Sequence, residues 1–201
     1  MLIAFNKPFR VMCQFSAGGT AMAVAQTIAR RTLADFIDVP RVYPAGRLDY
    51  DSEGLLLLTD DGALAHRISD PKYKLPKTYL LQVEGTPRAE QLDALRRGVE
   101  LNDGPTLPAD VSALDAAPDW LWPRDPPVRH RKSVTDAWIE ISIREGRNRQ
   151  LRRMTAAVGL PTLRLIRVRI GPHALAGLAP GAWREQSSVA MIGNATRIPR
   201  R

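Results

Sequence analysis

Residues 46–59 join a short acidic turn to a buried segment, and this pattern constrains the fold more than any other in the chain. Asp49 stands two positions after Arg47, and a run of leucines follows within a few residues. The run is too short to cross a membrane and ends at an Asp-Asp-Gly turn, so we expect a buried strand over residues 55–59. A carboxylate beside arginine stays ionised and can act as a nucleophile, which makes this turn a candidate site of chemistry.

The composition points to an anionic partner. The 201 residues include 29 lysines and arginines against 21 acids, which gives a net charge of +8 and a pI near 10.2. Nucleic acid fits this excess best and an anionic membrane surface second, while a solvated basic surface needs no partner at all. The single cysteine, Cys13, excludes an internal disulfide framework. Since no apolar stretch spans a bilayer and no signal-peptide layout is present, we expect a cytoplasmic protein without a membrane partner.

The remaining apolar patterns predict a sheet flanked by helices. Strand composition marks residues 2–6, 78–84, 138–144 and 162–170, with residues 11–15 as a candidate neighbour of the first strand. Helical patterns mark residues 20–36, as one or two helices, and residues 63–69, 88–97 and 148–158. Because these elements interleave irregularly with hairpin-like turns, we expect an α+β fold with a mainly antiparallel mixed sheet.

Other segments lack a regular pattern. Residues 101–105 form a turn cluster, and residues 117–132, rich in proline, tryptophan and charge, predict a loop. Residues 186–201 end in two arginines. We therefore expect one domain over residues 1–185, followed by a mobile basic tail.

The helix predicted over residues 148–158 has one strongly basic face and Asn148 as its N-cap. Arg149, Arg152 and Arg153 stand at i, i+3 and i+4, so their side chains lie together. Like charges repel one another, and the N-terminal helix dipole adds further positive potential. Such a face indicates an anionic partner, with a merely solvated helix as the plainer alternative.

Other kinds of site have little support. The acids within residues 46–59 are spaced like those of a calcium loop, but the flanks have strand composition and a leucine occupies the ninth position, which argues against an EF-hand. The histidines lack metal-ligand spacing, and no phosphate-cradling glycine loop is present. The sequence therefore predicts an enzyme that uses a carboxylate and arginines, without a metal or cofactor.

Three motifs resemble the signature of the RsuA-type pseudouridine synthases, in the order in which that family carries them. They are residues 46–62, Lys77-Thr78-Tyr79 and residues 145–154. The resemblance covers residues 2–185, and residues 101–108, 120–124 and 161–167 narrow it to members that modify large-subunit (23S) ribosomal RNA. It implies the pseudouridine synthase catalytic fold, acting as a monomer on ribosomal RNA without a cofactor. Because the first predicted strand begins at Leu2, no S4-type RNA-binding domain is expected before it.

The resemblance also implies roles for single residues. Asp49 is the catalytic nucleophile, which attacks either C1′ of the target ribose or C6 of the base, and Arg152 pairs with it. Tyr79 stacks on the uracil and helps to handle protons. Arg47 helps to hold the target nucleotide outside its RNA stack, and Leu151 lines the base pocket. The other implied substrate-binding residues are Lys77, Arg147, Arg149, Arg153, Arg167 and Arg169.

Further expectations concern neighbours of these residues. Asp51 and Glu53 are expected to shape the turn or to meet solvent. Arg167 and Arg169 stand two apart on a predicted strand, so we expect them to share one face. Two alternatives remain open: a pseudouridine synthase that acts on small-subunit ribosomal RNA or tRNA, and a non-catalytic RNA-binding or ribosome-assembly module.

Overall fold

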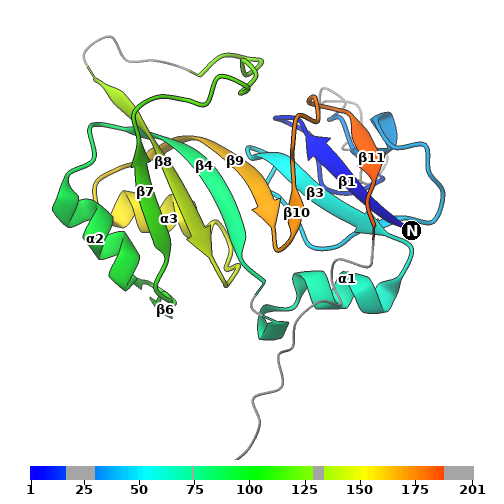
Figure 1. The fold of residues 1–201 in the computed structure, drawn as a ribbon, viewed down its shortest axis with the longest axis horizontal. Coiled ribbons are helices and arrows are strands. Elements are labelled where there is room, and N and C mark those ends of the chain that lie inside the picture. The colour runs from blue at the N-terminus through cyan, green and yellow to red at the C-terminus, as the bar shows by residue number, and fades with distance from the viewer. Residues whose placement is uncertain (17–29, 74, 129–133, 188–201) are drawn as a thin grey trace, which may run out of the picture.

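The structure is a computed structural model that describes residues 1–16, 30–73, 75–128 and 134–187. Within these residues a nine-stranded sheet runs across the molecule in the order β11-β1-β3-β9-β4-β8-β7, with β10 beside β9 and β2 beside β3 (Figure 1). Only the β3–β9 pair of this sheet is parallel in the described residues. The predicted α+β fold with a mainly antiparallel mixed sheet is confirmed.

The bounds of the elements are as follows. The strands of the sheet are β1 (Leu2–Lys7), β2 (Tyr43–Pro44), β3 (Glu53–Thr59), β4 (Lys77–Glu84), β7 (Asp110–Leu114), β8 (Asp136–Ile143), β9 (Thr162–Ile170), β10 (His173–Ala174) and β11 (Trp183–Glu185). The helices are α1 (Gly62–Ser69), α2 (Ala89–Arg97) and α3 (Gln150–Ala157), with 3-10 turns η1 (Leu33–Asp35) and η2 (Pro71–Tyr73). A separate hairpin pairs β5 (Glu100–Leu101) with β6 (Gly104–Pro105), at the predicted turn cluster. In the described part of the chain, no helix is long and apolar enough to cross a membrane.

Some predicted elements differ from the structure. The strand predicted over residues 11–15 is wrong, because Val11 forms only an isolated bridge with Arg31. Of the helices predicted over residues 20–36, residues 20–29 lie outside the described residues, and η1 is the only helical turn in the rest. The predicted loop at 117–132 contains no helix or strand up to residue 128, where the description stops. Most of the predicted C-terminal tail also lies outside the described residues.

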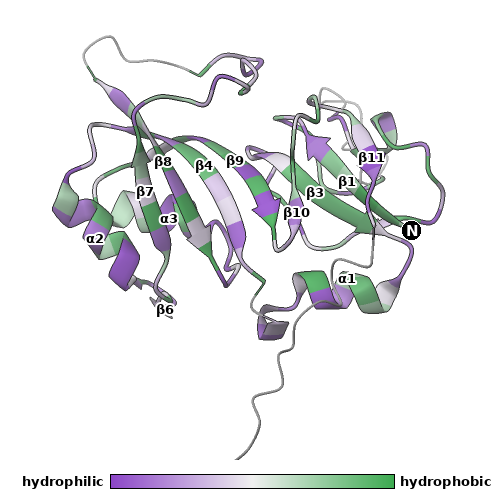
Figure 2. Cartoon of the chain, in the orientation of Figure 1, coloured by the Kyte–Doolittle hydropathy of each residue, from purple (hydrophilic) through white to green (hydrophobic). Residues whose placement is uncertain are grey.

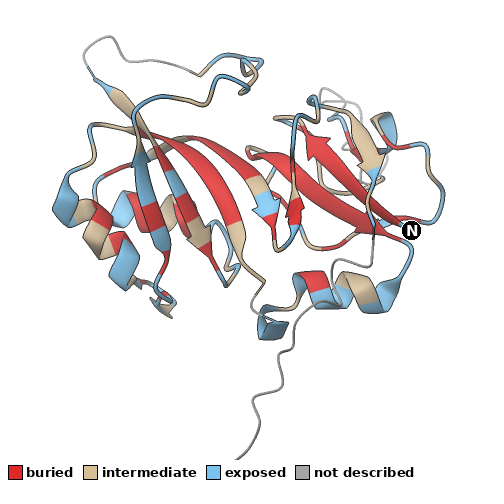
Figure 3. Cartoon of the chain, in the orientation of Figure 1, coloured by how far each residue is buried: buried red, intermediate tan, exposed pale blue. Residues whose placement is uncertain are grey.

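The strands β1 and β3 form the most deeply buried part of the sheet (Figures 2 and 3). Their alternate side chains enter two different clusters. Leu55 and Leu57 pack with Ile68 of α1, whereas Leu56 and Leu58 pack with Leu33 of η1. Burial on both sides explains why β3 has a continuous run of leucines rather than an alternating pattern.

The other half of the sheet has a core on one face, where α2 and α3 cover β4 and β8. Ile139, Ile141 and Ile143 alternate along β8 and all belong to this cluster, so they lie on one face of the strand. The helices contribute Leu92, Leu95, Leu151 and Met154. The two halves of the sheet therefore have separate cores.

These halves meet at the short parallel pair of β3 and β9, where Gly54 lies opposite Arg167. Gly54 has a φ of +100°, and a Cβ there would lie 2.3 Å from the carbonyl oxygen of Arg167. On its other side, Gly54 pairs with Lys7 of β1. Only glycine combines this backbone conformation with so close an approach.

Replacing Gly54 by alanine should therefore separate the two halves of the sheet. We expect Gly54→Ala to lower the free energy of unfolding by at least about 3 kcal/mol, since strain and a backbone clash add together. Urea unfolding followed by circular dichroism measures this loss. Gly62→Ala is the control, because a Cβ at this helix position meets nothing within 4 Å; its stability should change by less than about 1 kcal/mol. Equal effects of the two substitutions would contradict the close approach at Gly54.

Candidate active site

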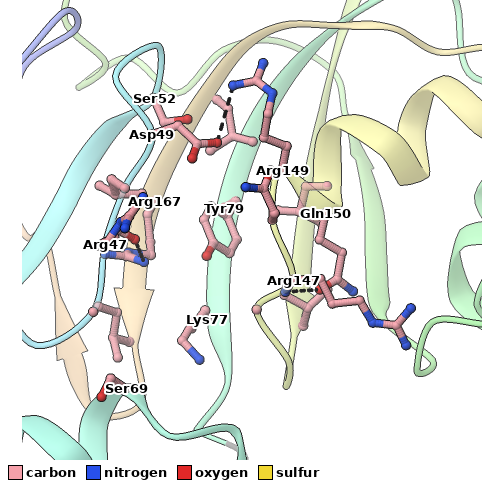
Figure 4. Close-up of a pocket in the computed structure, with 18 of the residues that line it drawn as sticks. Arg47, Asp49, Ser52, Ser69, Lys77, Tyr79, Arg147, Arg149, Gln150 and Arg167 are labelled. Atoms are coloured by element: carbon pink, nitrogen blue, oxygen red, sulfur yellow. Dashed lines mark hydrogen bonds and ion pairs between the residues drawn. The ribbon is translucent and has the colours of Figure 1, made fainter. Parts of the chain in front are cut away.

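A cavity of about 430 Å³ opens beside the junction of the two halves, between the 45–52 loop, the end of α1 and the start of α3. Its floor comes from β4 and β9 (Figure 4). All but two of the predicted site residues line it: Arg47, Asp49, Lys77, Tyr79, Arg147, Arg149, Leu151, Arg152 and Arg167. The two exceptions are Arg153 and Arg169.

Asp49 lies at one end of the cavity, in the loop before β3. Its carboxylate is 38% exposed, and its Oδ2 lies 3.5 Å from Nη1 of Arg149. The loop is closed by a bond from the Ser52 amide to the Asp49 carbonyl oxygen, at 3.1 Å. The amide of Arg10 donates to the Tyr50 carbonyl oxygen at 2.9 Å, which fixes the loop from the other side. Asp49 is thus a solvent-accessible anion on an anchored turn.

Arginines of α3 hold this loop through Asp51 rather than through Asp49. Arg149 donates to both carboxylate oxygens of Asp51, at 2.9 Å each. Arg152 donates to the Asp51 carbonyl oxygen at 2.7 Å and approaches its Oδ2 at 3.4 Å. Arg149, with a smaller contribution from Arg152, lowers the pKa of Asp51. The predicted pairing of Arg152 with Asp49 is therefore corrected: Arg149 pairs with Asp49, and Arg152 pairs with Asp51.

The start of α3 differs from the sequence prediction. Asn148 is not its N-cap; Arg149 takes that position in the left-handed region, with a φ of +46°. The side chain of Gln150 performs part of the capping, since its Oε1 accepts from the Arg147 amide at 2.9 Å. Gln150 is buried, lines the cavity and also donates to Glu145. Sequence reasoning missed Gln150, although a glutamine three residues after the loop residue that it caps resembles half of a capping box.

Glu53 forms a buried ion pair, which corrects the expectation that it meets solvent or only shapes the turn. Its carboxylate accepts from Nε and Nη2 of Arg164, at 2.8 and 2.9 Å. Nε1 of Trp122 donates to the same carboxylate at 2.9 Å. Glu53 and Arg164 are only 2% and 6% exposed. This cluster ties the first residue of β3, directly after the 45–52 loop, to β9.

A bulge in β9 decides which arginine faces the cavity. Thr78 pairs with Arg169, but Tyr79 pairs with Arg167, so β9 has one extra residue at this point. Paired residues of antiparallel strands lie on the same face, and the bulge therefore separates Arg167 from Arg169. Arg167 is buried beside Tyr79, whereas Arg169 is exposed and outside the cavity. The prediction that these arginines share one face is wrong.

Arg153 is the other predicted residue outside the cavity. It forms an ion pair with Asp103, with Nη1 at 2.8 Å from Oδ1. Arg147 lies beside it, donates to the Gly104 carbonyl oxygen at 2.8 Å and still lines the cavity. These contacts join the loop before α3 to the β5–β6 hairpin.

Lys7 of β1 is a further buried cation, besides Arg164 and Arg167. The Lys7 side chain is fully buried, and its Nζ donates to the carbonyl oxygens of Val11 and Pro8, at 2.8 and 3.0 Å. Burial lowers the pKa of Lys7 to about 8. Cys13 packs nearby as a half-buried apolar residue, and burial raises the pKa of its thiol.

Taken together, the cavity presents one carboxylate among several cations. Asp49 is the only acidic side chain among the described residues that line it. Tyr79 and Leu151 supply an aromatic ring and an aliphatic wall on the scale of a nucleobase. No group of His, Cys, Asp or Glu side chains in the described ranges could hold a metal ion. The site can therefore offer a carboxylate nucleophile to a flat, polyanionic substrate.

Several known proteins are similar to this chain in sequence or in fold. The sequence model of a family described as RNA pseudouridylate synthase matches residues 1–157. Ribosomal large subunit pseudouridine synthase E of Xanthomonas campestris pv. campestris is 63% identical over 184 residues, which cover 92% of this chain and 94% of that protein. The protein of the same name from Vibrio vulnificus is 53% identical over 186 residues, with coverages of 92% and 75%. A crystal structure of a pseudouridylate synthase matches with a TM-score of 0.74 at 30% identity, over 95% of this chain and 72% of that one.

Because Glu53 and Arg164 form a buried ion pair, we expect the loss of one partner to lower the stability of the fold strongly. Glu53→Gln leaves Arg164 buried and without its counter-charge, so we expect a loss of about 3–5 kcal/mol in the free energy of unfolding. Asp93→Asn is the control, because it removes one acid from an exposed Asp93–Arg96 pair; it should cost less than about 1 kcal/mol. Urea unfolding measures both losses, and a cost for Glu53→Gln as small as the control would refute the structural importance of the pair.

The lowered pKa of Lys7 should make the free energy of unfolding depend on pH. Its pKa is lower in the folded state than in the unfolded chain, so the unfolded state binds more protons between about pH 8 and its ordinary pKa of 10.5. Stability from this group therefore rises with pH through that window, by roughly 2 kcal/mol from pH 7.5 to pH 10. Lys7→Met should remove this rise. Urea unfolding at several pH values checks it, and parallel pH profiles of the two proteins would contradict the lowered pKa.

Proposed function

The chain belongs to the RNA pseudouridylate synthase family, and we propose that it converts uridine to pseudouridine in large-subunit (23S) ribosomal RNA. Relatives that are named for the large subunit align over nearly the whole chain, which supports this choice of substrate. We expect the enzyme to act as a monomer in the cytoplasm, where ribosomal RNA is assembled.

The observation that carries this proposal is the isolation of Asp49 in the cavity. Its neighbours in the cavity wall include Arg47, Arg149 and Arg152, whose positive charges attract phosphates. A protein that only binds RNA gains nothing from an accessible anion inside its basic cleft. A carboxylate nucleophile explains why the anion is there.

The reaction rearranges atoms within one nucleotide. Asp49 attacks either C1′ of the ribose or C6 of the uracil, and the bond between N1 and C1′ breaks. The base then turns over and C5 bonds to C1′. The bond to Asp49 breaks, which releases the carboxylate, the C5 proton is lost and N1 gains a proton. No group is gained or lost overall, so the reaction needs no external donor and no oxidant.

The surrounding side chains suit this sequence of events. We assign to Arg149, through its contact of 3.5 Å, the task of orienting the Asp49 carboxylate, and to Arg152 the task of holding the loop through Asp51. Tyr79 lies beside Asp49 in the cavity, where its ring can support the uracil while the base turns (Figure 4). Leu151 forms a wall of the base pocket, and Arg47 is an exposed cation that also lines the cavity.

The alternatives have less support. The relatives that are 63%, 64% and 53% identical to this chain carry the name of a large-subunit enzyme. This disfavours small-subunit ribosomal RNA and tRNA as the main substrate. Family membership and the position of Asp49 disfavour a non-catalytic RNA-binding or assembly module. Arg153 and Arg169, which lie outside the cavity, remain proposed contacts to flanking RNA.

Removing the nucleophile tests the proposal directly. Asp49→Asn keeps the size and shape of the side chain, so the fold and RNA affinity should persist while turnover falls at least about a thousandfold. Pseudouridines in total ribosomal RNA from a deletion strain, mapped by carbodiimide-blocked primer extension, should show one missing modification. The wild-type gene should restore it, and the Asp49→Asn gene should not.

Asp60→Asn is the matched control. Asp60 is an exposed acid near Asp49 in the sequence, and its side chain pairs with the N-terminal amine at 2.6 Å rather than with the cavity. This variant should restore the modification fully. Restoration by Asp49→Asn would exclude Asp49 as the nucleophile, and restored modification in the small subunit alone would exclude the large-subunit substrate.

A further inference from the structure

The cations of the cavity divide into two groups by their partners. At one end Arg149 and Arg152 are balanced by Asp49 and Asp51. At the other end lie Arg47, Lys77 and Arg167, which we call the floor cations (Figure 4). Within the described residues, no carboxylate lies at ion-pair distance from any floor cation. The floor of the cavity thus has an uncompensated positive charge.

Arg167 is the most deeply buried member of this group. It is 4% exposed, and its Nε donates to the Leu55 carbonyl oxygen at 2.8 Å. Its Nη1 donates to the Arg47 carbonyl oxygen at 3.4 Å, while Nη2 is shielded from solvent and has no hydrogen-bond partner among the described residues. A buried guanidinium that lacks a counter-ion is costly, because its charge is neither solvated nor paired. Its field extends into the adjoining cavity, where an anion would offset this cost.

Lys77 and Arg47 are placed to make the direct contacts. Lys77 is half-buried, at the start of β4, and Arg47 is exposed beside Arg167 in the close-up (Figure 4). Burial, together with the nearby Arg167 charge, lowers the pKa of Lys77. An anion between these side chains would relieve this repulsion and accept their N–H groups.

The position of Tyr79 separates the floor cations from the nucleophile. Figure 4 shows its ring between Asp49 on one side and Lys77 on the other. A nucleotide bound against this ring therefore meets a carboxylate at one end and cations at the other. Such an arrangement can orient a ligand that has one anionic group and one reacting group.

We propose that the floor cations form a binding site for a phosphate group of the target nucleotide, which orients its ribose and base toward Asp49. This inference rests on the proposed function, since that function supplies a nucleotide as the ligand. Arg47 and Lys77 donate to the phosphate oxygens, and Arg167 acts through its buried charge. The site at the Asp49 end has no need of a second phosphate, because its arginines are already paired.

Binding of mononucleotides tests this site without any turnover. Wild-type protein is titrated with uridine, uridine 5′-monophosphate, uridine 3′-monophosphate and inorganic phosphate, and binding is followed by NMR. We expect at least one monophosphate to bind at least about fivefold more tightly than uridine, since a charged hydrogen bond contributes to its affinity. The monophosphate that binds more tightly shows whether the 5′-phosphate or the 3′-phosphate of the nucleotide is held.

Variants of Lys77 then test whether the preference for a monophosphate over uridine depends on the floor cations. Lys77→Met should abolish the preference for the monophosphate while the affinity for uridine stays the same, and Lys77→Arg, which keeps the charge, should retain most of it. Lys72→Met is the matched control, because Lys72 is exposed on η2 and does not line the cavity. It should behave as wild type.

Several outcomes would overturn the proposal. They are equal wild-type affinities for uridine and both monophosphates, no binding of any of them, and equal losses for uridine and monophosphate in Lys77→Met. Inorganic phosphate that binds as tightly to Lys77→Met as to wild type would also refute it. A preserved phosphate preference in a protein that fails to modify ribosomal RNA would instead refute the proposed function and leave the phosphate site intact.

Discussion

The whole site depends on the close approach of β3 and β9 at Gly54. This glycine lies between Lys7 on one neighbouring strand and Arg167 on the other, and both of these cations are buried. The absence of a Cβ lets the Arg167 backbone reach β3, and the Arg167 side chain then bonds to the carbonyl oxygens of Leu55 and Arg47. The contact that joins the two half-sheets is therefore the same contact that fixes the floor of the cavity and the start of the 45–52 loop.

The three acids at the start of the 46–59 segment have different partners, and this leaves Asp49, the proposed nucleophile, the most weakly engaged of them. Glu53 binds Arg164 in the interior, and Asp51 takes the strongest hydrogen bonds of Arg149. Asp49 is left with one longer ion pair, at 3.5 Å. A carboxylate held by several short hydrogen bonds is a weak nucleophile, because its lone pairs are engaged. Because its two acidic neighbours take the short hydrogen bonds, the Asp49 carboxylate stays accessible for the nucleophilic role proposed above.

Sequence patterns predicted the main strands because burial leaves a visible apolar pattern: isoleucines alternate in β8, and leucines run without a break in β3. They failed where one residue departs from that period. The bulge beside Tyr79 reverses the face of Arg167 relative to Arg169, and no spacing rule detects an extra residue in a strand. The choice of Arg149 as partner of Asp49 was equally hidden, since several arginines of α3 lie within reach. Its left-handed backbone, unusual for arginine, aims this side chain at the loop.

The two ends of the cavity illustrate how one polypeptide can separate binding from chemistry with few residue types. Arginine occurs at both ends, but its partners differ. Where an acid neutralises it, as Asp51 does for Arg149, the guanidinium serves as a structural tie. Where only main-chain carbonyl groups meet it, as at Arg167, its charge remains available to a ligand. The placement of acids, more than that of the arginines, thus determines where a polyanion can be held and where a carboxylate can react.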